Sequence, residues 1–194
     1  MRSQLKDINF YKLTSQAKST KKSIAIMRTL FINRHAKSSW KHDGLRDFDR
    51  PLNSRGKINA KFMAEKFAAA EKPDLIISSP AERAKKTAFE FQNACSIPEE
   101  QFIFNENIYG ASVEGMSKII NGISDKYSSV MLFGHNPTFT ELAWYLDHNF
   151  NDHLVTCARV KIEFDLASWS LIGKNLGRVT DHDFPRKYSE MEDL

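Results

Sequence analysis

Arg34 and His35 follow directly on a short apolar segment, residues 29–33. The composition of this segment predicts a buried strand, so both polar side chains come at a strand end, before any helix can begin. A guanidinium group binds phosphate oxygens through a planar fork of N–H donors, and imidazole can bond to the same oxygens. The pair is therefore a candidate for binding a phosphate group.

Two later segments repeat this arrangement. Residues 75–79 form an apolar run that ends shortly before Arg83, and residues 130–133 form another that ends just before His135. In an open α/β sheet, ligands bind beyond the carboxyl ends of the strands, where helix N-termini attract anions. We therefore expect two arginines and two histidines to converge on one phosphate.

A long polar loop, residues 38–52, contributes a third candidate. Long loops within compact domains are usually functional. Arg50 lies near the end of this loop, and Pro51 restricts the backbone beside it. Arg50 is either a further phosphate ligand or a surface arginine paired with Asp47 or Asp49.

The hydrophobic pattern predicts the elements that must position these residues. Strands are predicted over 29–33, 74–79, 101–105, 128–133 and 160–164, with a further apolar stretch at 169–172; helices are predicted over 54–71, 80–94, 113–123 and 138–146. In the first helix the spacing predicts a buried face made by Ile58, Phe62, Met63, Lys66 and Phe67. Strands that alternate with helices predict a three-layer α/β/α fold with a mostly parallel central sheet.

Length and composition suit one soluble domain. The chain has 194 residues, its mean hydropathy is −0.47, and it has no apolar run long enough to span a membrane. Cys95 and Cys157 fit neither a disulfide framework nor a zinc spacing, so we expect reduced thiols and a cytoplasmic protein. His148 and His153 do not have the spacing of metal ligands, and we expect no metal site.

The positive charge is concentrated at the N-terminus. The net charge is +4, but residues 1–28 carry seven Lys/Arg and one acidic residue, so the rest of the chain is close to neutral. A neutral body does not favour nucleic-acid binding. We expect residues 1–28 to be a basic, disordered extension and 29–194 to be the domain; the alternative for the extension is a tether or targeting peptide. Met27 is a candidate for the true start.

Glu106 follows the predicted strand at 101–105. Its carboxyl group is a candidate proton donor to a leaving group, and the alternative is an ordinary loop acid. The sequence contains no P-loop and no dinucleotide-binding fingerprint, so we expect no cofactor.

Taken together, the motifs resemble those of the histidine phosphatase (phosphoglycerate mutase-like) superfamily, and within it the short SixA-like phosphohistidine phosphatases. The likeness extends over residues 27–186 and rests on four motifs: Arg34-His35, with Ala36 where the wider family has glycine; Arg50 in Asp-Arg-Pro-Leu; Arg83 in Ser-Ser-Pro-Ala-Glu-Arg-Ala; and His135 in Gly-His-Asn-Pro.

The resemblance implies a mechanism in which His35 is the nucleophile and forms a phosphohistidine intermediate that water hydrolyses, without a metal. It assigns the binding of the phosphoryl oxygens to Arg34, Arg50, Arg83 and His135. The implied substrate is phosphohistidine on a partner protein. The alternatives are a small phosphoester, which would need Glu106 as proton donor, and a phosphate-binding module without turnover. We expect a monomer that binds neither nucleic acid nor membranes.

Overall fold

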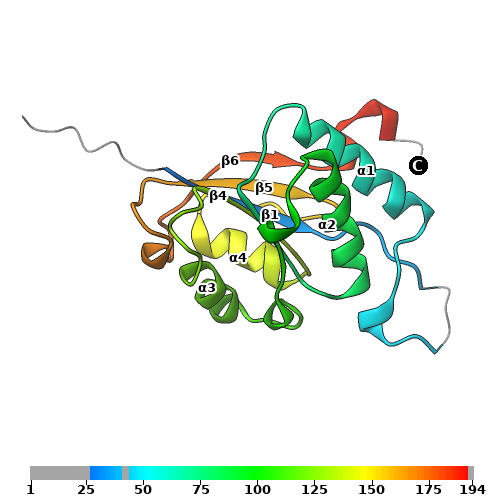
Figure 1. The fold of residues 1–194 in the computed structure, drawn as a ribbon, viewed down its shortest axis with the longest axis horizontal. Helices are drawn as coiled ribbons and strands as arrows, with labels where there is room; N and C mark the ends of the chain where they lie inside the picture. The colour runs from blue at the N-terminus through cyan, green and yellow to red at the C-terminus, as the bar shows by residue number, and fades with distance from the viewer. Residues whose placement is uncertain (1–26, 41–43, 192–194) are drawn as a thin grey trace, which may run out of the picture.

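A six-stranded sheet runs through the centre of the computed structural model, which describes residues 27–40 and 44–191 (Figure 1). The strands are β1 (Arg28–Arg34), β2 (Leu75–Ser78), β3 (Phe102–Phe104), β4 (Ser129–Gly134), β5 (Arg159–Phe164) and β6 (Arg178–Asp183). Their order is β3-β2-β4-β1-β5-β6, which leaves β3 and β6 at the two edges. Strands β1 to β4 are parallel, β5 is antiparallel to β1, and β6 is antiparallel to β5. The predicted mostly parallel sheet is confirmed.

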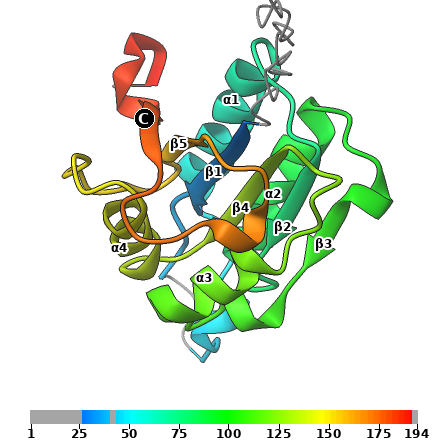
Figure 2. The ribbon, with the colours of Figure 1, turned by 90° about the vertical axis from the view of Figure 1, so that its left-hand side faces the viewer.

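Four helices cover the two faces of this sheet: α1 (Ser54–Ala68), α2 (Glu82–Ala94), α3 (Val113–Asn121) and α4 (Thr138–Leu146). Helices α1 and α2 pack together on one face, and α3 and α4 pack on the other (Figure 2). The predicted α/β/α layers are thereby confirmed. The start of α4 at Thr138, after Pro137, agrees with the sequence prediction.

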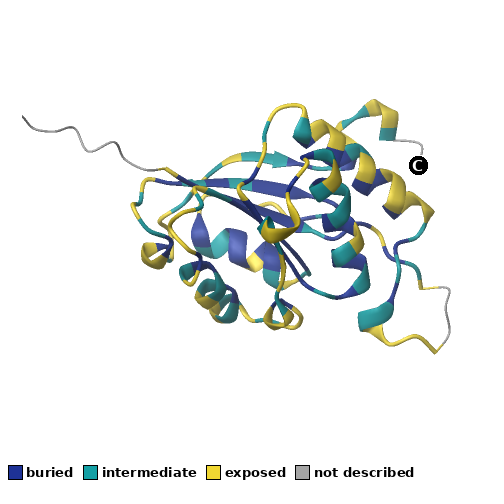
Figure 3. Cartoon of the chain, viewed as in Figure 1, coloured by how far each residue is buried: buried dark blue, intermediate teal, exposed yellow. Residues whose placement is uncertain are grey.

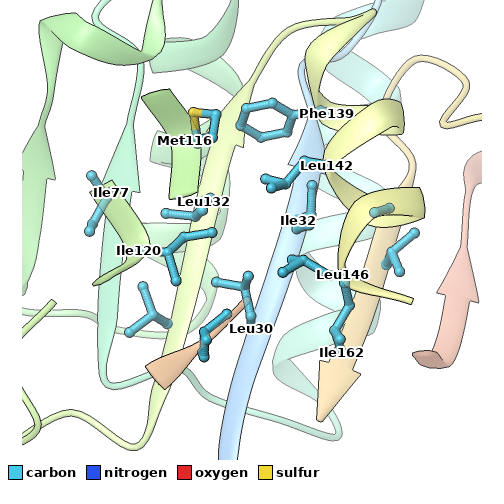
Figure 4. Close-up of a cluster of buried hydrophobic side chains, with 14 of the residues drawn as sticks. Leu30, Ile32, Ile77, Met116, Ile120, Leu132, Phe139, Leu142, Leu146 and Ile162 are labelled. Carbon is cyan, nitrogen blue, oxygen red and sulfur yellow. The ribbon is translucent and has the colours of Figure 1, made fainter. Parts of the chain in front are cut away.

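The strand residues alternate between the two cores. In β1, Leu30 and Ile32 belong to the core beneath α3 and α4, whereas Phe31 belongs to the core beneath α1 and α2. Figure 4 shows the first of these cores, in which Leu30 and Ile32 lie among side chains from α3 and α4. Because both faces are covered, the central strands are buried along their length (Figure 3).

Helix α1 begins where the sequence predicts and buries part of the predicted face: Met63 and Phe67 are buried and Phe62 is partly buried. The side chain of Asn53 caps the helix by accepting a hydrogen bond from the N–H of Gly56 at 2.7 Å. The predicted buried residue Ile58 is 43% exposed, and the side chain of Lys66 is also largely exposed. The prediction for these two was wrong because the interface with α2 and the sheet uses small residues and Met63 and Phe67; the buried set is Gly56, Asn59, Ala60, Met63, Ala64 and Phe67.

The C-terminal region contains an element that the hydrophobic pattern did not predict. The apolar stretch at 169–172 forms a single 3₁₀ turn, Trp169–Leu171, in which Trp169 is fully buried. Strand β6 follows in a mainly polar sequence and pairs with β5. Its stability comes from backbone pairing rather than from an apolar face, so no apolar periodicity signals it.

Other sequence predictions have different outcomes. Residues 1–26 of the predicted extension lie outside the described residues. Arg28 was predicted to belong to the extension, but it is the first residue of β1 and is buried. That Met27 is the true start stays a prediction. Cys95 and Cys157 are both buried and free. In the described part of the chain, no helix combines the length and apolar character needed to cross a bilayer.

Candidate active site

The carboxyl ends of β1 and β4 bring two histidines together. The strands are parallel neighbours with Arg34 opposite Gly134, so His35 and His135 each lie one residue past a strand end. The His35 N–H donates to the carbonyl of Gly134 at 3.1 Å, and the two imidazole rings are 5.2 Å apart between centroids. A side chain at Gly134 would lie 2.3 Å from the ring of Phe139, so glycine is required for this close approach.

The hydrogen bonds of His35 define its tautomer. The Nε–H of Arg83 lies 3.2 Å from Nε2 of His35. Because arginine can only donate, Nε2 must be the unprotonated nitrogen. Nδ1 therefore carries the proton and donates to the carbonyl of Ala36 at 2.7 Å. The ring thus presents a lone pair on Nε2, in a fixed orientation.

The surroundings of His35 keep it neutral. The residue is 8% exposed. Burial, together with the nearby charges of Arg83 and Arg34, lowers the pKa of His35 to about 3, against the opposing hydrogen bond to the Ala36 carbonyl. At neutral pH the imidazole is therefore uncharged, as a nitrogen nucleophile requires.

Arg83 reaches the site from the first turn of α2, as predicted. Besides its contact with His35, its Nη2 donates to Oδ2 of Asp47 at 2.8 Å and its Nη1 donates to the backbone carbonyl of the same aspartate at 2.5 Å. The side chain is buried, so the guanidinium is rigidly oriented beside the lone pair of His35.

Arg50 is held within the loop that precedes α1. Its Nε donates to the carbonyl of Ser39 at 3.0 Å, its Nη2 to Oγ of Ser38 at 2.6 Å, and its Nη1 to Oδ1 of Asp47 at 2.8 Å. The guanidinium also lies over the ring of Trp40, 3.2 Å from its centroid. Arg50 is buried, so the ion pair with Asp47 and a place in the site occur together rather than as alternatives.

Arg34 has more unused hydrogen-bonding capacity. Its Nη1 donates to the carbonyl of Leu154 at 2.9 Å, and its Nε is buried without a partner among the described residues. Burial lowers the pKa of Arg34. A phosphate oxygen beside it would find donors that the protein itself leaves unused.

His135 is fixed by neighbours from two other elements. Its Nε2 lies 2.9 Å from Oγ of Ser79, and its ring meets the edge of Tyr109 at 5.5 Å between centroids. Burial, and then the charges of Arg83 and Arg34, lower the pKa of His135 to about 4, although Asp47 opposes this effect. His135 is therefore also neutral near pH 7.

A small cavity of about 150 Å³ lies among the three arginines and His35, and its lining does not include His135; the lining residues are Arg34, His35, Lys37, Ser38, Trp40, Arg50, Arg83 and Thr156. No carboxylate is among the lining residues. A wider hollow of about 580 Å³ adjoins it through Lys37, Ser38 and Trp40. The charge of the lining suits a small oxyanion, and the hollow leaves room for the group that carries it.

The predicted residue Glu106 has no such position. It lies in a one-turn 3₁₀ helix, Glu106–Ile108, and is exposed. Among the described residues its carboxylate has no hydrogen bond or ion pair with the arginines or histidines of the site. The structure thus brings together Arg34, His35, Arg50, Arg83 and His135 but gives Glu106 no contact with them.

Sequence reasoning did not identify three further residues of the site: Ser79, Asp47 as a contact of Arg83, and Tyr109. Ser79 directly follows β2 and precedes Pro80, and its position just past a strand end could have indicated a site residue. Tyr109 is 62 residues from its partner Asp47, and no local pattern joins them. In the described ranges, no group of three or more His, Cys, Asp or Glu side chains is arranged to hold a metal ion.

Comparison with known proteins gives the same family from sequence and structure. A family model described as "Histidine phosphatase superfamily (branch 1)" matches residues 30–127. An uncharacterised chloroplastic protein of Arabidopsis thaliana is 32% identical over 156 residues, which are 76% of this chain and 71% of that protein.

Solved structures share the fold. A SixA protein from Agrobacterium tumefaciens is 28% identical and superimposes with a TM-score of 0.69 over 81% of this chain and 98% of the other. The protein histidine phosphatase SixA in complex with tungstate is 21% identical, with a TM-score of 0.68 over 82% and 98%. A mycobacterial glucosyl-3-phosphoglycerate phosphatase is 14% identical, with a TM-score of 0.58 over 79% and 97%.

Proposed function

Because the chain belongs to branch 1 of the histidine phosphatase superfamily, we propose that it is a phosphatase in which His35 attacks phosphorus and that it removes phosphate from phosphohistidine on a partner protein. The observation that carries the proposal is the state of His35, which lines the cationic cavity: Nδ1–H donates to a carbonyl, and Nε2 is the unprotonated nitrogen and accepts from Arg83. A neutral imidazole held in one orientation is a prepared nucleophile.

The reaction has two displacements. Nε2 of His35 forms a bond to phosphorus while the bond between phosphorus and the leaving group breaks, and the leaving group takes a proton from solvent water. Water then attacks the phosphohistidine, the P–N bond breaks, and inorganic phosphate and neutral His35 are released. Positioning and charge stabilisation dominate phosphoryl transfer, and we assign both to Arg34, Arg50 and Arg83, with His135 beside them.

Two features support a protein substrate. The cavity opens into the larger hollow beside Trp40, whose side chain is 75% exposed, so a protein surface can reach it. A structural relative at 21% identity bears the name protein histidine phosphatase. Imidazole is also a better leaving group than an alkoxide, so this substrate does not depend on a proton from Glu106.

A small phosphoester is the second candidate, because a structural relative is named as a phosphatase of glucosyl-3-phosphoglycerate, although at 14% identity. This alternative requires a proton donor for the leaving alkoxide. Replacing Glu106 by glutamine separates the two cases: a large loss of rate confined to phosphoesters would assign Glu106 as that donor.

The test is turnover of a phosphohistidine-bearing carrier protein beside a panel of small phosphoesters, with EDTA present throughout. We expect the carrier to be dephosphorylated by the wild type and by His148→Ala, a matched control at an exposed histidine. We expect His35→Ala to lose turnover and also the acid-labile phosphoenzyme that rapid quenching traps in the wild type.

Three results would change the proposal. Preference for a small ester would keep the mechanism and move the function to metabolite hydrolysis. Full activity of His35→Ala would exclude His35 as the nucleophile, and loss of activity with EDTA would exclude a metal-independent reaction. Phosphate binding without turnover of either substrate class would leave a binding module.

A further inference from the structure

In this structure the carboxylate of Asp47 accepts hydrogen bonds from Arg50 and Arg83, two of the arginines assigned to phosphate binding. Asp47 lies in a one-turn 3₁₀ helix, Asp47–Asp49, in the loop between β1 and α1. Its Oδ1 accepts from Nη1 of Arg50 at 2.8 Å; its Oδ2 accepts from Nη2 of Arg83 at 2.8 Å and from the Tyr109 hydroxyl at 2.9 Å. Two guanidinium groups and a hydroxyl are donors that would suit the oxygens of a phosphate equally well.

The same contacts cover the nucleophile. The Nε–H of Arg83 donates to the lone pair on Nε2 of His35. Both terminal nitrogens of Arg83 donate to Asp47. That lone pair has to attack phosphorus, so the hydrogen bond to Nε2 must break before the reaction. Three of the five N–H groups of Arg83 are engaged in this way, so a phosphoryl group that binds Arg83 competes for it with Asp47 and His35.

Replacing Asp47 by phosphate at Arg83 and Arg50 costs electrostatic free energy because the Asp47 carboxylate is negatively charged. Hydrogen bonds from Tyr109 and Arg50 and the charge of Arg83 outweigh the effect of partial burial and hold the pKa of Asp47 at about 2. The carboxylate is therefore ionised near pH 7. It neutralises part of the charge of two arginines and repels an incoming anion.

We propose that Asp47 is a specificity-determining residue: its carboxylate competes with phosphate for Arg83 and Arg50, weakens the binding of free phosphate and so promotes release of the product. A phosphoryl group carried on a larger substrate gains further contacts in the adjoining hollow, which free phosphate does not. The inference rests on the proposed function in that this cavity is the phosphate site. Asp47 itself takes no part in bond making.

The test is the affinity for inorganic phosphate, measured by titration calorimetry near pH 7 with tungstate as a second probe. In Asp47→Asn the size of the side chain and an acceptor oxygen remain, but the charge is removed. We expect phosphate to bind about tenfold more tightly, a change of about 1.4 kcal/mol, and product inhibition to become stronger. Asp47→Glu keeps the charge, and we expect its phosphate affinity to stay closer to the wild type.

The matched control is Asp49→Asn, two residues away in the same turn. Asp49 pairs with the exposed Arg46 at 2.7 Å, and within the described residues its side chain makes no bond to the arginines of the site. Its removal deletes the same charge without freeing Arg83 or Arg50. We expect less than a twofold change in phosphate affinity.

Each outcome decides between the explanations. Unchanged or weaker phosphate binding in Asp47→Asn would overturn the inference and leave the proposed function standing. Equal tightening in Asp47→Asn and Asp49→Asn would also overturn it, because net charge alone would then explain the effect. If the wild type binds phosphate but hydrolyses nothing, the proposed function fails while the affinities still decide the role of Asp47; if no variant binds phosphate, both fail.

Discussion

The two ends of β1 each carry an arginine, and the contacts of the two differ. At the start, Arg28 is 2% exposed; its terminal nitrogens donate to the carbonyls of Asp125 and Tyr127 at 3.0 and 2.9 Å and of Ala167 at 2.6 Å. It also lies 3.3 Å from the Asp125 carboxylate. At the other end, Arg34 donates to a single carbonyl, that of Leu154.

This difference separates a structural arginine from a candidate functional one. Arg28 binds backbone carbonyls of loops that follow α3 and β5, so its guanidinium joins parts of the chain. Arg34 borders a cavity and keeps donors available. Arg28 is buried, whereas Arg34 is only partly buried, and the terminal nitrogens of Arg28 make three hydrogen bonds where those of Arg34 make one.

The largest effect is expected at the start of the strand. Arg28→Met removes a buried charge and leaves its carbonyl partners without a donor, so we expect the free energy of unfolding to fall by about 3 kcal/mol. Urea unfolding followed by circular dichroism measures this change. The turnover rate of the folded variant should stay within about threefold of the wild type, and a loss of rate without a loss of stability would contradict the comparison.

The matched change at the other end should have the opposite profile. We expect Arg34→Met to lower the turnover rate about 10²-fold, comparable with the loss of one preorganised donor, and to change the unfolding free energy by less than about 1 kcal/mol. Steady-state rates and the same urea titration test both parts. If the two variants lose stability equally, Arg34 is as important for the folded structure as Arg28, and the comparison fails.

The last effect concerns the dependence of stability on pH. The folded pKa of His35 is about 3, below the ordinary value of 6.5, so between these values the unfolded chain binds more protons than the folded one. The free energy of unfolding should therefore fall as the pH falls through this window, by at most about 1.4 kcal/mol per pH unit for this residue. Unfolding titrations between about pH 4 and 6.5 should show a shallower slope in His35→Ala than in the wild type. An unchanged slope would mean that His35 is accessible to protons when folded.

The sequence predicts the centre of the site because parallel strand pairing brings together residues that each directly follow a predicted strand. Once β1 and β4 are neighbours, residues just past their ends must lie together, and His35 and His135 occupy those positions. Arg83 follows from the first turn of the next helix. Strands β1 to β5, the helices α1 to α4 and these three residues can therefore be predicted from patterns of a few residues each.

The parts that escape prediction depend on contacts between distant segments. Asp47 and Tyr109 meet across 62 positions, and a lone aspartate in a loop has no pattern that indicates its partner. Glu106 follows a strand, but it lies in a 3₁₀ turn and is exposed, so its role as a proton donor stays a prediction. Strand β6 has no apolar periodicity in its sequence, and it is recognised as a strand only by its pairing with β5.

The two edges of the sheet also bear on how copies of the chain meet in concentrated solution. An exposed strand edge is a template on which another chain can add a strand, and long apolar edges promote aggregation. At β3 the exposed residues Ile103 and Phe104 belong to a strand of only three residues, so a strand from another chain could form few backbone hydrogen bonds with it. At β6 the edge is longer, but it carries Asp181 and Arg178, whose charges would have to be desolvated by any strand that joined it. One edge is protected by its brevity and the other by its charge.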